Sequence, residues 1–180
     1  MYAFVHIGKT AGSNMSALLR RSFGLAHCDV EPWRGYMALP FGARDWRWVR
    51  RLHPPLRSIA GHTVAPWSDL ETVVPDVRYY TFLREPLART ASHYQYHEQQ
   101  MGKQRPFETF IAIPRQRNFQ CRMISGKPSA EAAIAMVERN EMFVGLLEDF
   151  DRSLALLSAW MDGALLVDSQ VRNAAPSQSI

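Results

Sequence analysis

A lysine and several short polar side chains stand in one turn near the amino terminus. The turn is Gly8-Lys9-Thr10-Ala11-Gly12-Ser13-Asn14, between an apolar segment and a helical pattern. Backbone N–H groups at the start of a helix bind anions, and glycines let the backbone approach a phosphate closely. The turn therefore predicts a phosphate site with Lys9 as a mobile charge; the alternative is a surface turn with an isolated lysine. Its spacing differs from the common nucleotide loop, whose lysine directly follows the second glycine.

An arginine and a hydroxyl form a second candidate for phosphate binding. Arg84 follows the aromatic strand candidate Arg78–Leu83, and Ser92 stands eight positions later in the next expected helix. Ligands of parallel sheets gather at the carboxyl ends of the strands, and an arginine fork with a hydroxyl suits a phosphate. Taken alone, Arg84 is better explained by a surface ion pair with Glu85 or Asp76.

His62 is the candidate for proton transfer. It follows a further strand candidate in Ala60-Gly61-His62, so we expect it on the same rim as Lys9 and Arg84. A neutral imidazole there can take a proton from a hydroxyl, although a lone histidine is often structural. We expect the His6 side chain to be turned into the fold and to be structural.

Other polar residues are candidates for contact with a substrate. The expected acceptor side holds Gln95, His97 and Arg122. Trp46 and Trp48 are interleaved with five basic residues that would suit an anionic sugar, unless the segment is a solvated loop: Arg44, Arg47, Arg50, Arg51 and Arg57. His93 and His97 have helical i,i+4 spacing, but no third ligand is evident, so we predict no metal site.

The elements that must position these residues alternate along the chain. Strand candidates cover 2–7, 56–60, 78–83 and 142–147, and helix candidates cover 15–23, 86–100, 107–113, 118–124, 129–139 and 149–161. A capping-box pattern at 68–71 predicts a short helix, whereas 25–57 and the tail 172–180 read as irregular. Alternating strands and helices predict an α/β fold with a parallel sheet flanked by helices on both faces.

Composition limits the class of protein. The 180 residues predict a single domain over 1–180, and 47% hydrophobic with 21% charged residues excludes a disordered, collagen-like or coiled-coil chain. The net charge of +4 suits an anionic ligand but is too small to indicate nucleic-acid binding. Cys28 and Cys121 make no metal or disulfide framework. No signal peptide or apolar membrane span is visible, so we predict a cytoplasmic protein; no pattern indicates an oligomeric state.

Four motifs together resemble one family. HIGKTAGS (6–13) resembles the HIPKTAGT/S loop that binds the 5′-phosphosulfate in sulfotransferases dependent on PAPS (3′-phosphoadenosine-5′-phosphosulfate). TFLREPLARTASHY (81–94) resembles the family's 3′-phosphate motif FLRDP…R..S.Y. Gly61-His62 and Asn118-Phe119-Gln120-Cys121-Arg122-Met123-Ile124 are similar to carbohydrate sulfotransferases of the heparan 2-O type, and VGLLEDFDRSL (144–154) is similar to VGLTERFDESL. The motifs occur in the family's order over about residues 2–160, and the chain resembles a soluble bacterial-type member.

The resemblance implies a P-loop-like sulfotransferase fold and a reaction. PAPS would be the cofactor and PAP the product, with no metal, and the acceptor would be a hydroxyl, predicted to belong to a saccharide. Lys9 would neutralise the charge on the leaving oxygen, and His62 would be the general base. Glu71 or Asp69 would be the alternative bases. The cofactor-binding residues would be Gly8, Lys9, Thr10, Ala11, Gly12, Ser13, Asn14, Arg84 and Ser92.

Departures from the family pattern leave other functions open. Gly8 replaces the usual proline and Cys121 the usual threonine, and the chain ends at Ile180, soon after Arg172-Asn173, where family members continue. One alternative is a truncated or non-catalytic module that binds PAP or PAPS without turnover. The other is a P-loop phosphotransferase that uses ATP, although this would need a later lysine and an aspartate for Mg²⁺.

Overall fold

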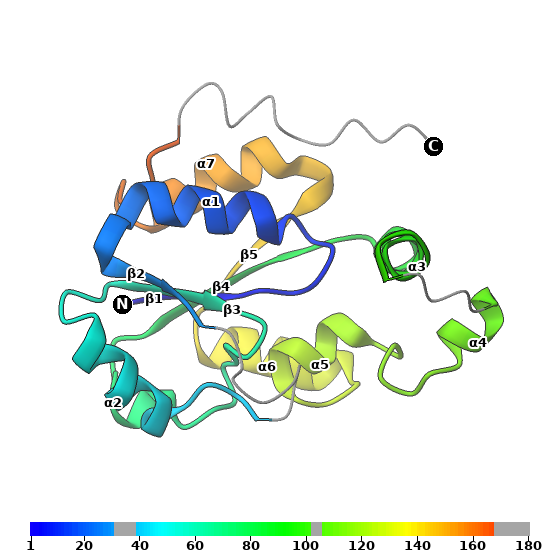
Figure 1. Ribbon diagram of the computed structural model, residues 1–180, viewed down its shortest axis with the longest axis horizontal. Helices are drawn as coiled ribbons and strands as arrows, with labels where there is room; N and C mark the ends of the chain where they lie inside the picture. Colours follow the sequence, from blue (N-terminus) through cyan, green and yellow to red (C-terminus); the bar gives the residue numbers. More distant parts are fainter. Residues whose placement is uncertain (31–38, 102–105, 168–180) are drawn as a thin grey trace.

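A parallel sheet of five strands forms the centre of the fold, with helices on both faces (Figure 1). The computed structural model describes residues 1–30, 39–101 and 106–167. The strands are β1 (Tyr2–Val5), β2 (His27–Asp29), β3 (Ser58–Gly61), β4 (Arg78–Leu83) and β5 (Phe143–Leu146). Their order across the sheet is β2-β3-β1-β4-β5, and every neighbouring pair is parallel. The predicted α/β class is confirmed.

The helices form two layers and a lateral group. The α-helices of the described residues are α1 (Gly12–Phe23), α2 (Ala43–Leu52), α3 (Pro86–Met101), α4 (Phe107–Ile111), α5 (Phe119–Ser125), α6 (Ala130–Arg139) and α7 (Phe150–Trp160). Single 3₁₀ turns occur at η1 (Gly24–Ala26), η2 (Leu70–Thr72) and η3 (Leu147–Asp149). In Figure 1, α1 and α7 lie above the sheet, α2, α5 and α6 lie below it, and α3 and α4 lie beyond the carboxyl ends of the strands. No helix within the described ranges is long and apolar enough to span a bilayer.

Successive residues of the central strands enter two separate cores. Phe4 of β1 and Tyr80 of β4 pack on the side of α1 and α7, with Met15 and Leu154. The opposite core, between the sheet and α2, α5 and α6, contains Ala3, Val5, Tyr79, Trp46, Met123 and Ala133. Burial on both faces explains why the strands are almost continuously apolar rather than alternating with polar residues.

The sheet topology places the predicted site residues at one edge. β1 pairs with β3 on one side (Val5 with Gly61) and with β4 on the other (Phe4 with Tyr80). After β1 the chain adds β2 and β3 on one side of it and then β4 and β5 on the other. The strand order therefore reverses at β1, and ligands of such sheets bind outside the carboxyl ends of the strands at this switch point. The Gly8 turn, His62 and Arg84 follow β1, β3 and β4, and all three therefore meet at this edge.

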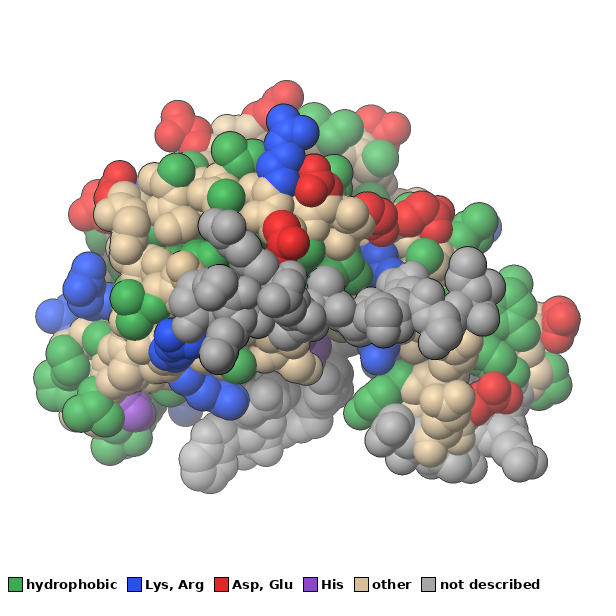
Figure 2. Space-filling model, turned by 90° about the horizontal axis from the view of Figure 1, so that it is seen from above, with side chains coloured by type: hydrophobic (Ala, Val, Ile, Leu, Met, Phe, Trp, Pro, Cys, Tyr) green, Lys and Arg blue, Asp and Glu red, His purple; other side chains and the backbone are tan. Residues whose placement is uncertain are grey.

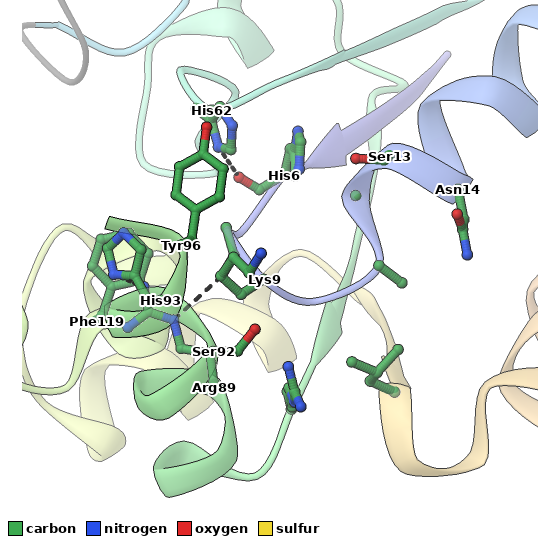
Figure 3. A pocket seen from close by; sticks show the side chains of 15 residues that line it. His6, Lys9, Ser13, Asn14, His62, Arg89, Ser92, His93, Tyr96 and Phe119 are labelled. Atoms are coloured by element: carbon green, nitrogen blue, oxygen red, sulfur yellow. Dashed lines mark hydrogen bonds between the residues drawn. The ribbon is translucent and has the colours of Figure 1, made fainter. Parts of the chain in front are cut away.

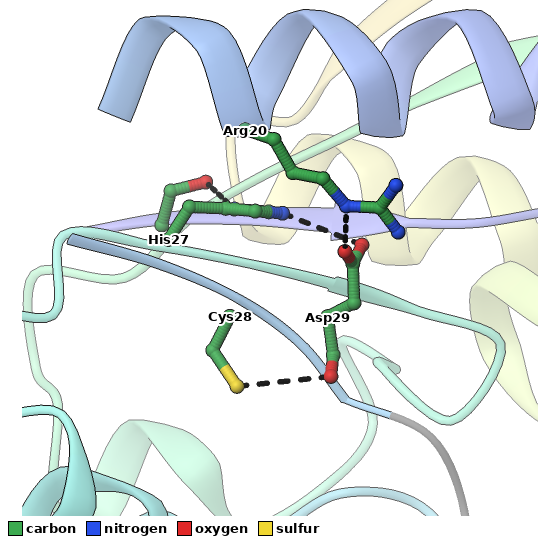
Figure 4. Close-up of polar contacts among 5 residues, drawn as sticks. Arg20, His27, Cys28 and Asp29 are labelled. Atoms are coloured by element: carbon green, nitrogen blue, oxygen red, sulfur yellow. Dashed lines mark hydrogen bonds and ion pairs between the residues drawn. The ribbon is translucent and has the colours of Figure 1, made fainter. Parts of the chain in front are cut away.

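Two elements lie where the sequence predicts irregular structure. β2 is an edge strand of three residues, and polar contacts hold it (Figure 4). Buried His27 lies 3.0 Å from Ser58 Oγ of β3, and Asp29 accepts from Arg20 of α1 at 2.6 Å. The contact with Ser58 joins residues 31 positions apart, which explains why no local pattern predicts the strand. Burial raises the pKa of the neighbouring Cys28 thiol, so that thiol stays protonated at neutral pH.

Helix α2 is the second correction. Trp46 is buried in the core, whereas Trp48 is exposed and Arg44, Arg47, Arg50 and Arg51 point to solvent. The amino end of the helix is held by Asp69 Oδ1, which accepts the Ala43 N–H at 2.8 Å. The short helix predicted near Ser68 is the single turn η2. Residues 31–38 of the segment predicted to be irregular, and the predicted irregular tail 172–180, lie outside the described residues.

Candidate functional site

A cavity of about 450 Å³ opens at the carboxyl edge of the sheet, between the Gly8 turn, the end of β4 and α3 (Figure 3). Seen from the side of α1 and α7, the molecule is hollowed between its main body and the part formed by α3 and α4 (Figure 2). The structure brings nine of the predicted residues to the cavity: Gly8, Lys9, Ala11, Gly12, Ser13, Asn14, His62, Arg84 and Ser92. The two phosphate candidates and the histidine therefore share one cavity.

The turn after β1 has the backbone shape of an anion site. Lys9 and Ala11 are both left-handed, with φ of 71° and 68°, and they alternate with residues of negative φ. This alternation turns successive N–H groups toward one point, which makes a concavity for an anion. Left-handed backbone is costly for residues with a Cβ and tends to persist at functional sites. The prediction that the Thr10 side chain lines the site is wrong. Its buried hydroxyl donates to the Ile7 carbonyl at 2.8 Å and does not line the cavity.

His62 is oriented for accepting a proton. Its Nδ1 lies 2.7 Å from the His6 carbonyl oxygen. A carbonyl can only accept, so Nδ1 carries the proton and Nε2 carries the lone pair in the neutral ring. The main chain thus fixes the tautomer that a general base requires.

His6 differs from the expectation of a structural side chain turned into the fold. Its ring lines the cavity and stacks on His62, with ring centroids 3.9 Å apart. Burial, and then the charge of His62, lowers the pKa of His6 to about 4, so the ring is neutral at pH 7. Its underside rests on Gly12, where a Cβ would come within 1.6 Å of His6 Nε2. Gly12 is required by this contact, which no local sequence pattern reveals.

The cavity is cationic and contains no carboxylate among the residues that line it. Two effects lower the pKa of Lys9: its burial, which is the larger, and the nearby positive charge of Arg84. The ammonium of Lys9 also lies 4.8 Å from the ring centroid of Tyr96. Two cations without an acidic neighbour favour a ligand that brings its own negative charge.

Arg89 is a site residue that sequence reasoning missed. It is only 1% exposed and lines the cavity. Its Nε donates to the Gly8 carbonyl at 3.3 Å, its Nη2 to His93 Nδ1 at 3.1 Å, and its guanidinium lies 3.9 Å over the Phe119 ring. Burial lowers the pKa of Arg89 to about 10, so it stays charged at pH 7.

One nitrogen of Arg89, Nη1, is buried without a hydrogen-bond partner in the described part of the chain. A buried charged donor without an acceptor is costly, and an anionic ligand would satisfy it. Arg89 fits the arginine inside the quoted motif FLRDP…R..S.Y. That motif could have indicated that Arg89 belongs to the site, but an arginine in the middle of a helix is usually exposed on the surface.

Three predicted substrate residues do not line this cavity. Gln95 is exposed on α3, and His97 packs beside His93, with their Nε2 atoms 3.2 Å apart. Arg122 instead lines a separate hollow of about 50 Å³, which it shares with His62 and Trp67. His62 therefore lines both the main cavity and this hollow.

The alternative bases are engaged elsewhere. Asp69 caps α2, and Glu71 pairs with Arg139 at 2.6 Å. Across the described ranges, no group of three or more His, Cys, Asp and Glu residues could hold a metal ion.

Comparison with solved structures identifies the fold. The mouse sulfotransferase SULT7A1, complexed with PAP, is similar over 97% of this chain and 62% of its own, with a TM-score of 0.59 and 14% identity. A sulfotransferase from Alicyclobacillus acidocaldarius is similar over 95% of this chain and 87% of its own, with a TM-score of 0.53 and 14% identity. No family model and no curated protein sequence matches the chain. The chain therefore has the P-loop-like fold of the sulfotransferases, and it spans 62% of the length of the mouse protein.

Proposed function

We propose that this chain is a sulfotransferase that takes the sulfuryl group of PAPS and transfers it to a hydroxyl of an acceptor. The observation that carries the proposal is the carboxylate-free cationic cavity, lined by Lys9, Arg84 and Arg89, at the ligand edge of a sulfotransferase fold. The unpartnered Nη1 of Arg89 fits the same proposal, because an anionic donor substrate would supply the missing acceptor.

The donor would be held at both of its phosphate ends. In this proposal the N–H groups of residues 10–14, with Ser13 and Asn14, bind the 5′-phosphosulfate, while Arg84 and Ser92 bind the 3′-phosphate. Thr10 would contribute its backbone only, since its hydroxyl is bonded to Ile7. Recognition of the 3′-phosphate would separate PAPS from ATP.

Lys9 and His62 would perform the charge and proton steps. PAPS supplies an already activated sulfate, so the chain has to align the acceptor oxygen, the sulfur and the leaving oxygen and stabilise the charge that develops. Lys9 would neutralise the leaving phosphate oxygen. His62 Nε2 would take the proton of the acceptor hydroxyl, which typically contributes about 10²–10⁴-fold.

The acceptor is proposed to be a saccharide. The second hollow that His62 lines contains the partly exposed ring of Trp67 and the side chain of Arg122, whose Nε and Nη2 donate to the Arg117 and Pro114 carbonyls. The aromatic face suits a sugar ring, and the positive charge of Arg122 suits the carboxylate of an acidic sugar. Both cysteines are free, which fits the proposed cytoplasmic location.

The test is transfer of ³⁵S-labelled sulfate from PAPS to a panel of oligosaccharides. The wild-type chain should label an acceptor, and Lys9→Ala and His62→Ala should each reduce turnover by about 10²-fold or more while leaving the fold intact. Turnover retained in His62→Ala would remove it as the base. Tight binding of PAP with no turnover on any acceptor would favour the non-catalytic module, and preference for ADP over PAP would favour the phosphotransferase.

A further inference from the structure

β4 extends beyond its neighbour β1, and Arg84 directly follows the end of β4. β1 pairs with β4 as far as Phe4 against Tyr80 and then turns away into the Gly8 loop. On the other side, β5 accompanies β4 to Leu83. Consecutive residues of a parallel strand direct their N–H and C=O groups to alternate sides. The main chain of Arg84 therefore needs a partner where β1 has left the sheet.

Gln120, from the first turn of α5, supplies that partner. Its Oε1 accepts the Arg84 N–H at 3.0 Å, and its Nε2 donates to the Arg84 carbonyl at 2.7 Å. A side-chain carboxamide carries one acceptor and donors, as a peptide unit does. Gln120 thus bonds both main-chain groups of one residue, as a neighbouring strand would.

Further contacts hold the same corner. The N–H of Glu85 donates to Glu148 at 2.7 Å, and the Glu85 carboxylate accepts the N–H groups of Leu87 and Ala88 at 3.0 and 2.6 Å, which caps α3. These contacts fix the chain after Arg84, whereas Gln120 fixes Arg84 itself.

We propose that Gln120 is a positioning residue that sets the direction in which the Arg84 guanidinium enters the cavity, and thereby the recognition of the second phosphate. The inference rests on the proposed function, in which Arg84 binds the 3′-phosphate. Gln120 does not line the cavity, so its effect passes through Arg84. Arginine is a long side chain, so a small rotation of its backbone displaces the guanidinium substantially. Misplacement by about 1 Å can cost about 10²-fold where geometry matters.

The test compares the dissociation constants of adenosine 3′,5′-bisphosphate and adenosine 5′-monophosphate by titration calorimetry. The wild-type chain should prefer the bisphosphate, and Arg84→Met should lose that preference. Gln120→Ala should weaken the bisphosphate about tenfold and the monophosphate by less than about twofold. Because Gln120 acts only through the Arg84 guanidinium, the double variant should lose no more affinity for the bisphosphate than Arg84→Met alone.

A second variant makes the effect dependent on pH. In Gln120→Glu the carboxylate can accept the Arg84 N–H but faces the Arg84 carbonyl without a proton, and protonation restores the donor. Its preference for the bisphosphate, relative to wild type at the same pH, should be low at about pH 7.5 and recover toward about pH 5. Gln99→Glu makes the same chemical change at an exposed position of α3 and should match wild type throughout.

The outcomes separate the inference from the function beneath it. A wild-type chain that binds both nucleotides equally overturns the role of Arg84 and the inference with it. A preference that Arg84→Met loses and both Gln120 variants keep overturns the inference alone. Equal weakening of both nucleotides in Gln120→Ala, with a lower melting temperature, assigns Gln120 a structural role and also overturns the inference.

Discussion

The two glycines of the turn 8–14 differ in what an added side chain would meet. A Cβ on Gly8 would meet nothing within 4 Å, and its φ is not in the left-handed region. A Cβ on Gly12 would overlap the His6 ring, at 1.6 Å from Nε2. The His6 ring therefore fills the space beside Gly12, whereas no protein atom fills the space beside Gly8. The loss of the usual proline at position 8 leaves the turn intact.

Substitution of these glycines tests this difference. Gly12→Ala should force His6 off His62 and destabilise the fold by about 1–3 kcal/mol, as overpacking of a filled site does. Gly8→Ala is the matched control and should be neutral or stabilise by up to about 1 kcal/mol, because it restricts only the unfolded chain. Urea unfolding measures both. A Gly12→Ala chain as stable as Gly8→Ala would show that the His6 ring can move away without cost.

At the scale of elements, contacts distant in sequence decide what the local pattern leaves open. Asp69 reaches Ala43 at the start of α2 from 26 positions away, and Gly42 is placed so that a Cβ would meet Asp69 Oδ1 at 2.2 Å.

We predict that Asp69→Ala costs about 1 kcal/mol of stability, the usual cost of a lost helix cap, whereas Asp69→Asn keeps an acceptor and loses less. Both variants should keep the proposed sulfuryl transfer, since Asp69 is not in the cavity. Loss of transfer in Asp69→Asn with unchanged stability would return Asp69 to the list of bases.

The same reasoning explains how far the sequence predicts this molecule. β4 and α3 carry strong signals, an aromatic run followed by Pro86, so Arg84 and Ser92 are placed correctly from the pattern alone. β2 and α2 depend on partners elsewhere in the chain, and so do the cavity roles of Arg89 and His6. The guanidinium of Arg89 is held by Gly8, His93 and Phe119, which come from three segments. Packing across the sheet edge creates these roles, and the sequence motifs that contain Arg89 and His6 do not reveal those contacts.

At the scale of the whole molecule, the proposed ligand would join the two halves of the sheet. The Gly8 turn belongs to β1 and α1, and Arg84 belongs to the half built later from β4, α3 and β5, yet both line one cavity. A ligand that binds only the folded chain stabilises all of it, by about 2.7 kcal/mol at a concentration 100 times its dissociation constant. For a domain of this size that is a rise in melting temperature of roughly 5–10 °C.

Adenosine 3′,5′-bisphosphate should therefore raise the melting temperature more than ADP at equal concentration, as measured by differential scanning calorimetry. The rise should shrink with added salt, because Lys9 and Arg84 act as charges on an anion in a cavity open to solvent. Lys9→Met should lower the shift for both nucleotides, since the 5′ end is common to them, whereas Arg84→Met should lower only the shift for the bisphosphate. A different result would contradict the proposal: ADP stabilises the chain as much as the bisphosphate, and Arg84→Met changes neither shift. The site would then not bind the 5′- and 3′-phosphates of one nucleotide with its two halves.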